Sequence, residues 1–222
     1  MGTTVAKAFL PLAGTPMAVY SLRTLSAVSA VTSVTLVVGT EHVDLANSVV
    51  TEHAPWPLPI RITRGGAERQ DSVAAGLSVV DSATDMVIVH DAARPFVSTS
   101  CVQACIAAAT VHGAAIAAVP ARDTVKVVDQ HPIIRQTLDR RTIWLAQTPQ
   151  VFHTPLLRRA YEQARHDGYL GTDDAELVER IGATVSVVTG ESSNLKITTP
   201  EDLLWAEWYL RTHASTAATR LS

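Results

Sequence analysis

The chain has 222 residues, of which 47% are hydrophobic and 18% are charged, and its formal net charge is −3. This composition suits a folded chain of one large domain or two small ones, and it argues against disorder. The slight negative charge argues against a general nucleic-acid-binding surface. No apolar run approaches the ~18 residues of a membrane span, and the start lacks a signal-peptide pattern, so we expect a cytoplasmic protein without nucleic-acid or membrane partners.

Strand-like and helix-like segments alternate along the chain. Expected strands cover 31–38, 60–63, 86–89, 114–119 and 185–188, and expected helices cover 41–53, 70–80, 98–111 and 200–213. Apolar strands that alternate with helices favour a mostly parallel, doubly wound sheet with both faces covered. We therefore predict a single α/β domain over residues 1–222.

One segment breaks this alternation. Residues 124–128 and 133–137 flank a turn and predict an antiparallel hairpin outside the parallel core. Two strands cannot bury both of their faces alone, so the hairpin either packs against a partner subunit or covers the site as a flap. We define residues 122–142 as the arm.

The two cysteines, Cys101 and Cys105, lie four residues apart in an expected helix and share one face of it. We expect both to be buried structural residues rather than a disulfide or a metal site.

The strand at 86–89 stops at charged residues, in the order His90, Asp91, Ala92, Ala93, Arg94. The carboxyl edge of an open α/β sheet is where ligands bind, and the alanines allow a ligand to lie close to the backbone. A surface pair of Asp91 and Arg94 is an equally favoured interpretation of this piece alone.

Other candidate motifs are modest when taken singly. Gly65 and Gly66 lead into a helix whose bare amides suit an anion or a base edge, although a plain turn capped by Asp71 or Ser72 explains them as well. A residue such as Lys7 or Lys196 is by default a solvated surface lysine. The segment 171–174 is typical of a helix cap with acids at the positive end of the dipole.

The order of these pieces resembles, nearly end to end, the 2-C-methyl-D-erythritol 4-phosphate cytidylyltransferases. The matching motifs are Lys-Ala-Phe-Leu-Pro-Leu at 7–12, Gly-Gly-Ala-Glu-Arg-Gln-Asp-Ser-Val at 65–73, Val-His-Asp-Ala-Ala-Arg-Pro at 89–95, Arg-Asp-Thr-Val-Lys at 122–126, Asp-Arg at 139–140, Gln-Thr-Pro-Gln at 147–150, Thr-Asp-Asp-Ala at 172–175 and Asn-Leu-Lys-Ile-Thr-Thr-Pro-Glu-Asp-Leu at 194–203. Eight ordered matches argue strongly against chance.

The resemblance implies a Rossmann-like nucleotidyltransferase that joins CTP to a polyol phosphate. It implies roles residue by residue: Lys7, Lys196 and Arg140 as catalytic cations; Gly66, Ala67, Ser72, Asp91 and Ala92 at the nucleotide; and Arg94, Thr124, Thr148 and Thr172 at the second substrate. It also implies Mg²⁺ held mostly by the CTP phosphates, with Asp91 as its one protein ligand. The arm would reach the neighbouring subunit's site in a homodimer.

The chain departs from the family at its start. Members begin with a strand and a loop of the form Ala-Ala-Gly-x-Gly-x-Arg that cradles the triphosphate, whereas Met1 and Gly2 stand where the residues after that arginine would fall. The absent strand is a central one, so we expect the sheet to be open in its middle. We also expect Met1 to be an internal methionine of a longer reading frame.

Two other functions remain open at this point. One is a ribitol 5-phosphate cytidylyltransferase, a close relative, although Ala93 favours methylerythritol phosphate because the ribitol enzymes commonly have Val there. The other is a catalytically impaired relative that lacks the triphosphate loop. Retention of Lys7, Arg140 and Lys196 argues against that second function.

Overall fold

The computed structural model describes residues 7–218, with side chains described up to residue 213. Met1 and Gly2 lie outside the described residues. The elements, in chain order, are η1 (Lys7–Phe9), β1 (Pro11–Leu12), β2 (Thr15–Pro16), α1 (Met17–Ser26), β3 (Val34–Val38), η2 (Thr40–His42), α2 (Val43–Glu52), β4 (Ile60–Arg64), α3 (Arg69–Ser78), β5 (Met86–Val89), α4 (Thr99–His112), β6 (Ala114–Pro120), β7 (Lys126–Val128), β8 (Ile134–Thr137), η3 (Arg140–Thr142), β9 (Trp144–His153), α5 (Thr154–Asp167), α6 (Asp174–Arg180), β10 (Ser186–Thr189) and α7 (Pro200–Ala218).

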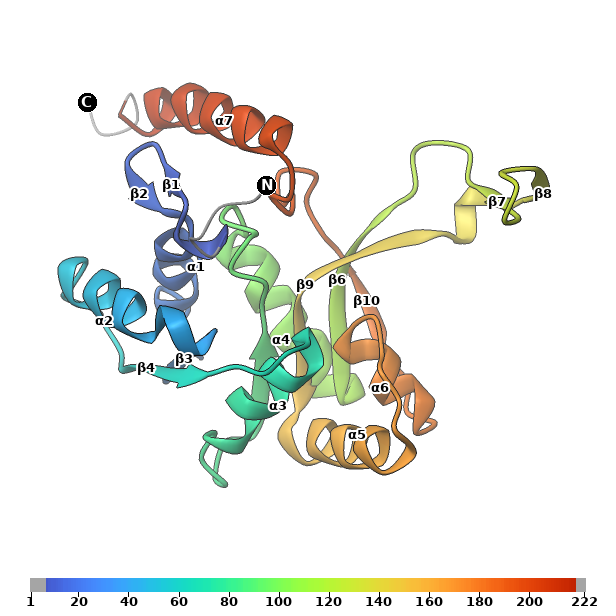
Figure 1. Cartoon of the computed structure of the whole chain (residues 1–222), viewed down its shortest axis with the longest axis horizontal. Coiled ribbons are helices and arrows are strands. Elements are labelled where there is room, and N and C mark those ends of the chain that lie inside the picture. The colour runs from blue at the N-terminus through green and yellow to red at the C-terminus, as the bar shows by residue number, and fades with distance from the viewer. Residues whose placement is uncertain (1–6, 219–222) are drawn as a thin grey trace.

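The central strands form two sheets (Figure 1). Four strands lie in the order β10-β6-β9-β5, with β10 parallel to β6 and β9 antiparallel to both of its neighbours. β3 and β4 are parallel and, within residues 7–218, pair only with each other. The expected α/β fold is therefore present. The division of its strands into two sheets agrees with the expectation of an open middle.

The pairing in the four-stranded sheet is mixed, which corrects the expectation of mostly parallel strands. The reason is β9, which the sequence pattern does not reveal because it lacks an apolar run. Trp144 and Leu145 are exposed, whereas Gln147, Thr148 and Gln150 are buried polar residues. These three are tolerated in the core because their side chains hydrogen-bond to backbone atoms and neighbouring side chains.

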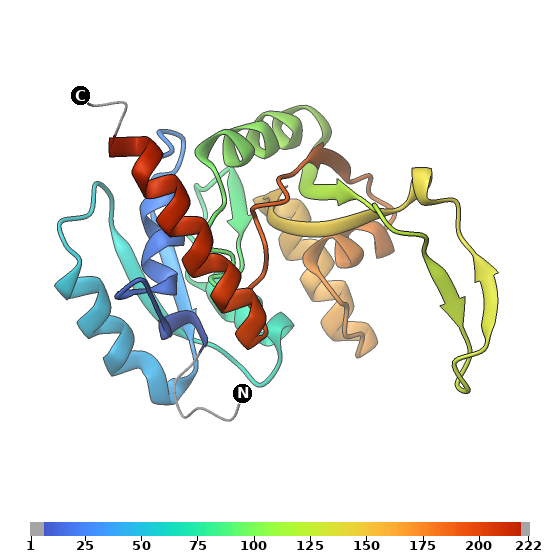
Figure 2. The same ribbon diagram turned by 90° about the horizontal axis from the view of Figure 1, so that it is seen from above.

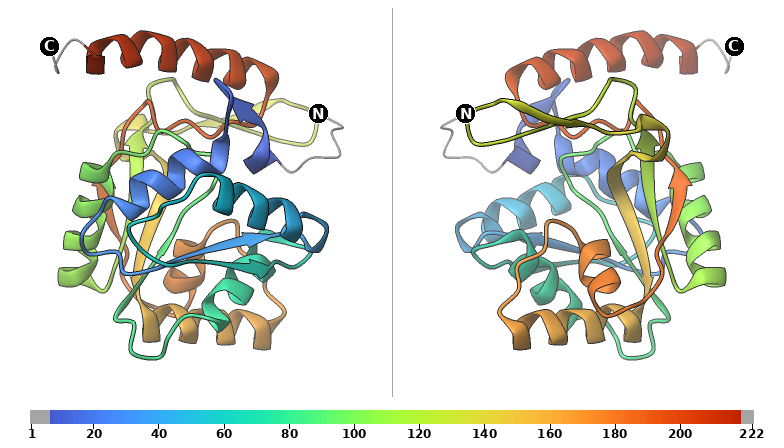
Figure 3. Two further views of the ribbon diagram at one scale, coloured as in Figure 1. Left: turned by 90° about the vertical axis from the view of Figure 1, so that its left-hand side faces the viewer. Right: turned by 90° about the vertical axis from the view of Figure 1, so that its right-hand side faces the viewer.

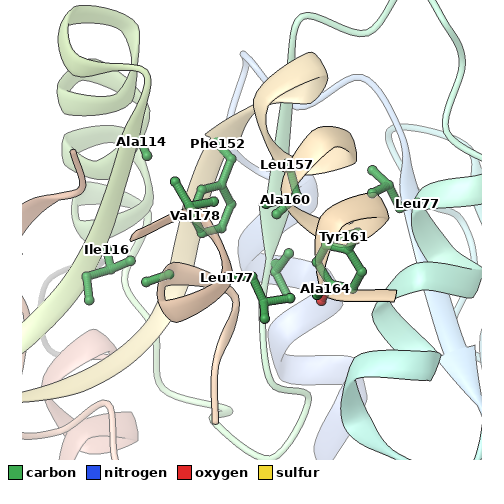
Figure 4. Packing of buried hydrophobic residues seen from close by; sticks show 12 residues of the cluster. Leu77, Ala114, Ile116, Phe152, Leu157, Ala160, Tyr161, Ala164, Leu177 and Val178 are labelled. Atoms are coloured by element: carbon green, nitrogen blue, oxygen red, sulfur yellow. The ribbon is translucent and has the colours of Figure 1, made fainter. Parts of the chain in front are cut away.

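Helices cover both faces of the four-stranded sheet, as predicted; Figure 3 shows α4 on one side and α5 and α6 on the other. Alternate residues of β6 face opposite ways, which is the period of two of a strand. Ala114 and Ile116 pack toward α5 and α6, a cluster seen in Figure 4, whereas Ala115 and Ala117 pack against α4. The two cysteines of α4 are free and buried in this second cluster, also as predicted.

The predicted hairpin is present as β7 and β8, and the arm projects from the body (Figures 1 and 2). Every residue of both strands is exposed. Four apolar side chains of the arm, Val127, Val128, Ile133 and Ile134, are 40%, 50%, 54% and 58% exposed. The described part of the chain therefore leaves these side chains uncovered.

The last helix, α7, begins at Pro200 as predicted and lies across β1 and β2 (Figure 3). Its Tyr209 ring packs on Trp205 and Phe96, with centroids 5.0 and 4.8 Å apart. The contact with Phe96 holds α7 against the segment between β5 and α4. Among the helices of residues 7–218, none is long and apolar enough to cross a membrane.

Candidate active site

Asp91, two residues after β5, lies at the centre of a cluster of cations. Its Oδ2 is 2.9 Å from Lys196 Nζ and 3.6 Å from Arg94 Nε, and its Oδ1 is 3.3 Å from Arg69 Nε. The Asp91 side chain is only 14% exposed. Burial alone raises the pKa of this carboxyl, but Lys196, Arg69 and Arg94 outweigh burial and hold the pKa below its ordinary value. Three cations thus surround one carboxylate, which suits a site for anions.

The guanidinium of Arg94 has a hydrogen bond at Nη1 but none at Nε among the described residues. Its Nη1 donates to the backbone oxygen of Asn194 at 2.9 Å. Its Nε is buried and has no hydrogen-bond partner among the described residues, although Asp91 is near. A buried donor without a close hydrogen bond is costly, and the ion pair with Asp91 at 3.6 Å offsets part of that cost.

His90 organises the backbone of this strand end. Its Nε2 is 3.1 Å from Arg94 O, and its Nδ1 is 3.1 Å from Thr148 Oγ1. Burial lowers the pKa of His90 to about 4, so the ring is neutral at pH 7. With its proton on Nε2, the ring donates to Arg94 O and accepts the Thr148 hydroxyl proton. The Thr148 oxygen also accepts from Asp91 N at 2.9 Å, which brings Thr148 to the cluster.

A buried pair of amide side chains anchors the segment that contains Lys196. Asn194 is fully buried and donates through Nδ2 to Thr148 O at 2.8 Å. Gln147 Nε2 donates to Glu191 O at 3.0 Å and to Asn194 O at 3.4 Å. These contacts join the loop after β10 to β9, so Lys196 approaches Asp91 from a rigid support.

Gly65 and Gly66 form the turn between β4 and α3. A Cβ on Gly66 would overlap Asp71 Cβ, and a Cβ on Gly65 would overlap Ser72 Oγ, so the turn has room only for glycine. Gly66 N donates to Ser72 Oγ at 3.2 Å. The N-cap of α3 is Glu68 and not Asp71 or Ser72, but Asp71 completes the capping box by accepting from Glu68 N at 3.1 Å. Ala67 is exposed at the tip and has no polar side-chain group to offer.

Thr172 lies in the loop before α6. Its hydroxyl and its amide donate to Glu176 Oε2 at 2.8 and 2.6 Å. Asp173 caps α6 by accepting from Glu176 N at 2.9 Å, so the predicted helix cap is confirmed. Asp174 then contacts Arg69, with 2.7 Å between its Oδ2 and Nη2, and this contact connects the Thr172 loop to the Asp91 cluster.

Lys7 reaches the same region from the start of η1. Its Nζ donates to Thr198 O at 3.3 Å, two residues beyond Lys196. The ammonium is exposed and thus available at the edge of the cluster.

Thr124 and Arg140 belong to the arm and are exposed. Arg140 Nη1 donates to Arg122 O at 2.8 Å, which steadies the base of the arm. Figures 1 and 2 show η3, which contains Arg140, well away from the end of β5. Neither Thr124 nor Arg140 is among the residues that contact Asp91 in the described part of the chain.

The residues around Asp91 do not form a cation cage by themselves. Both Asp91 oxygens contact cationic side chains, and residues 7–218 contain no group of three His, Cys, Asp or Glu placed to hold a metal. A single carboxylate fits Mg²⁺ only as a minor ligand, because Mg²⁺ at such sites takes one or two carboxylates together with substrate phosphates and water.

Two of these contact residues, Arg69 and Asp174, are absent from the residues inferred from the sequence. A usable signal exists for Arg69, because a cation in the first turn of a helix opposes the helix dipole and calls for a specific partner. Asp174 offers no such signal, since an acid in the first turn of α6 is ordinary.

The chain is similar to known proteins over nearly its whole length. The profile of the family described as 2-C-methyl-D-erythritol 4-phosphate cytidylyltransferase matches residues 1–212. Proteins of that name from Caldanaerobacter subterraneus subsp. tengcongensis and Syntrophus aciditrophicus are 42% and 46% identical, over 95% and 92% of this chain and 93% and 88% of theirs.

Solved structures agree as well. The crystal structure of 4-diphosphocytidyl-2C-methyl-D-erythritol synthase from Anaerococcus prevotii DSM 20548 has a TM-score of 0.85 at 31% identity, over 92% of this chain and 93% of that one. The 2-C-methyl-D-erythritol 4-phosphate cytidylyltransferase of Thermus thermophilus has a TM-score of 0.77 at 35% identity, with the same coverage. The chain therefore belongs to the 2-C-methyl-D-erythritol 4-phosphate cytidylyltransferase family.

Proposed function

We propose that this chain transfers the cytidylyl group of CTP to 2-C-methyl-D-erythritol 4-phosphate and releases pyrophosphate. The observation that supports this most is the cluster of Arg69, Arg94 and Lys196 around buried Asp91, in which Arg94 Nε lacks a hydrogen bond. An acceptor phosphate oxygen bonds to the α-phosphorus of CTP. The bond from that phosphorus to the bridging oxygen breaks, and pyrophosphate leaves with the electron pair.

The nucleophile is already an anion, so this reaction needs no strong general base. The protein has to hold two polyanions in line and to stabilise the negative charge that develops. We assign Lys7 to the α-phosphate and Lys196 to the acceptor phosphate. When bound with CTP, Mg²⁺ would supply further neutralisation of the triphosphate.

The glycine turn and the strand end receive the nucleotide in this proposal. Gly66 and Ala67 would contact the cytosine edge through backbone groups, with Ser72 holding the turn in shape. Asp91 and Ala92 would lie near the ribose, and Asp91 would be the minor protein ligand of the metal. The small side chain of Ala92 leaves space for the sugar.

Arg94, Thr148 and Thr172 would line the second substrate. Thr124 and Arg140 would complete that pocket in a neighbouring subunit, with the arm crossing between two copies of the chain. The exposed apolar side chains of the arm support a homodimer, since a partner would cover them.

Pyrophosphate release from CTP is the direct test, with methylerythritol phosphate or ribitol 5-phosphate as the acceptor. We expect kcat/KM to favour methylerythritol phosphate by at least about tenfold, because a site that hydrogen-bonds its substrate discriminates between polyols. A preference for ribitol 5-phosphate would contradict the acceptor assignment. Absence of release with either acceptor would contradict the transferase.

A further inference from the structure

Arg69 joins two carboxylates from distant parts of the fold. Its Nε is 3.3 Å from Asp91 Oδ1, and its Nη2 is 2.7 Å from Asp174 Oδ2. Asp91 follows β5, Asp174 begins α6, and Arg69 itself is the first residue of α3, directly after the glycine turn. One guanidinium therefore ties three segments together.

Because Asp174 is buried, loss of its ion pair with Arg69 would be costly. The Asp174 side chain is 0% exposed and the Arg69 side chain is 33% exposed. The other Asp174 oxygen accepts a hydrogen bond from the Tyr161 hydroxyl. Removal of the cation would leave a buried carboxylate with neutral donors only, which is strongly unfavourable. The position of the α6 start thus depends on Arg69.

Gln70, the next residue of α3, holds the same loop at a second point. Its Nε2 donates to Tyr169 O at 3.0 Å, and its Oε1 accepts from Gly171 N at 2.9 Å. Both contacts are to backbone atoms, so they fix the path of the loop and not merely a side chain. Arg69 and Gln70 of α3 therefore both bind the loop 169–174, which contains Thr172.

We propose that Arg69 is a positioning residue that couples the two substrate pockets, an inference that rests on the proposed function. The glycine turn at the start of α3 would hold the nucleotide, and the loop 169–174 would hold the polyol phosphate. Ordering of the turn by CTP is transmitted through Arg69 and Gln70 to the loop. By thermodynamic linkage, each substrate then tightens the binding of the other.

Hydrogen exchange of the loop tests this coupling without any turnover. CTP should slow amide exchange in residues 169–174 of the unmodified protein, and this protection should be lost in Arg69→Gln. Arg69→Lys should retain part of the protection, because an ammonium reaches one carboxylate at a time whereas a guanidinium fork reaches both. Equal protection of the loop in the unmodified protein and in Arg69→Gln would overturn the inference.

Steady-state kinetics supply the second readout. Arg69→Gln should raise KM for both substrates about tenfold, the usual size of coupling across one salt-bridge network, with a smaller change in kcat. Gln70→Ala should raise KM for both substrates, and more for the polyol phosphate, because Gln70 contacts the backbone of the loop directly. Arg158→Gln is the matched control, because it removes a half-buried arginine that donates to Val80 O at 3.0 Å without contacting the site.

The outcomes separate the two proposals. An active unmodified protein whose KM values do not change in folded Arg69→Gln, Arg69→Lys and Gln70→Ala would overturn the coupling and leave the transferase intact. Failure of the unmodified protein to bind CTP would overturn both. A fall in stability without a change in KM, as expected of Arg158→Gln, would reduce Arg69 to a structural residue.

Discussion

The cluster around Asp91 and the arm both pair acids with arginines, but they do so in opposite surroundings. Asp91 and Asp174 are buried, and their partners come from α3, the end of β5 and the loop before α7. In the arm, Asp129 pairs with Arg135 and Asp139 with Arg141, each only a few residues away and largely in solvent. Buried pairs constrain distant segments, whereas exposed pairs contribute little.

The Asp91 cluster and the arm therefore differ in whether a single chain supplies all the contacts of their side chains. The Asp91 cluster is assembled within a single chain. The arm has a defined hairpin, but its apolar side chains and Arg140 have no cover from the described residues of the same chain. A dimer would supply that cover.

The largest expected effect lies at the edge of the cluster. Lys7→Ala should lower kcat by about a thousandfold, because one charge that stabilises the transition state is lost while a solvent-exposed side chain contributes little to folding. Steady-state pyrophosphate release measures kcat, and thermal melting measures the stability of the fold. Lys126→Ala is the control from the arm, where the Lys126 ammonium donates to Thr137 Oγ1 at 2.7 Å. A Lys7→Ala protein with near-normal kcat would remove Lys7 from the mechanism.

The next effect is the pH dependence that the His90 ring, near the cluster, adds to the stability of the fold. The pKa of His90 is about 4 in the fold and 6.5 ordinarily. Between these two pH values, the His90 ring is therefore protonated in the unfolded chain and neutral in the folded chain. The contribution of His90 to stability is therefore full above about pH 6.5 and is lost as the pH drops toward 4, an effect of about 3 kcal/mol for this one group. Urea unfolding at pH 7.5, 5.5 and 4.5 measures the slope.

His90→Gln is the matched variant for this slope. Glutamine keeps one acceptor for Thr148 and one donor for Arg94 O but does not titrate. Its unfolding free energy should change less between pH 7.5 and 5.5 than that of the unmodified protein. Identical slopes would show that another group controls the acid response.

A smaller effect tests the arm. Arg140→Ala should raise KM for the polyol phosphate about thirtyfold, as expected when a charged hydrogen bond to a phosphate is lost, and leave KM for CTP nearly unchanged. Mixing Arg140→Ala with Lys7→Ala subunits should restore activity, because one hybrid site then has both intact residues. No recovery after subunit exchange, verified by mass spectrometry, would count against shared sites.

The smallest effect concerns the glycine turn. Gly66→Ala should raise KM for CTP about tenfold, because the added methyl overlaps Asp71 and shifts the turn. Ala67→Ser is the control on the adjacent residue, where a backbone contact would be unaffected. If both variants bind CTP like the unmodified protein, the turn does not contact the nucleotide.

The sequence predicts the elements with clear hydrophobic periods and misses those with mixed polarity. Strands β3 to β6, the hairpin and the start of α7 follow from apolar runs and proline. β9 does not, because its buried half contains Gln147, Thr148 and Gln150. The motifs likewise identify Asp91, Arg94 and Lys196. They do not reveal that Arg69 connects Asp91 to Asp174, since that contact spans 105 residues between Arg69 and Asp174.

The carboxylate of Asp91 has a consequence for which anions the site accepts. Lys196 and Arg94 both contact Asp91, so a substrate phosphate that binds them as proposed would compete with this carboxylate, and its binding would be an exchange of one anion for another. Chloride or acetate brings the same single charge as the tethered carboxylate and gains little from the exchange. A phosphate monoester above its second pKa of about 6 brings two charges and can displace it. In the proposed mechanism, Asp91 would therefore compete with incoming anions and favour a dianion over monovalent anions.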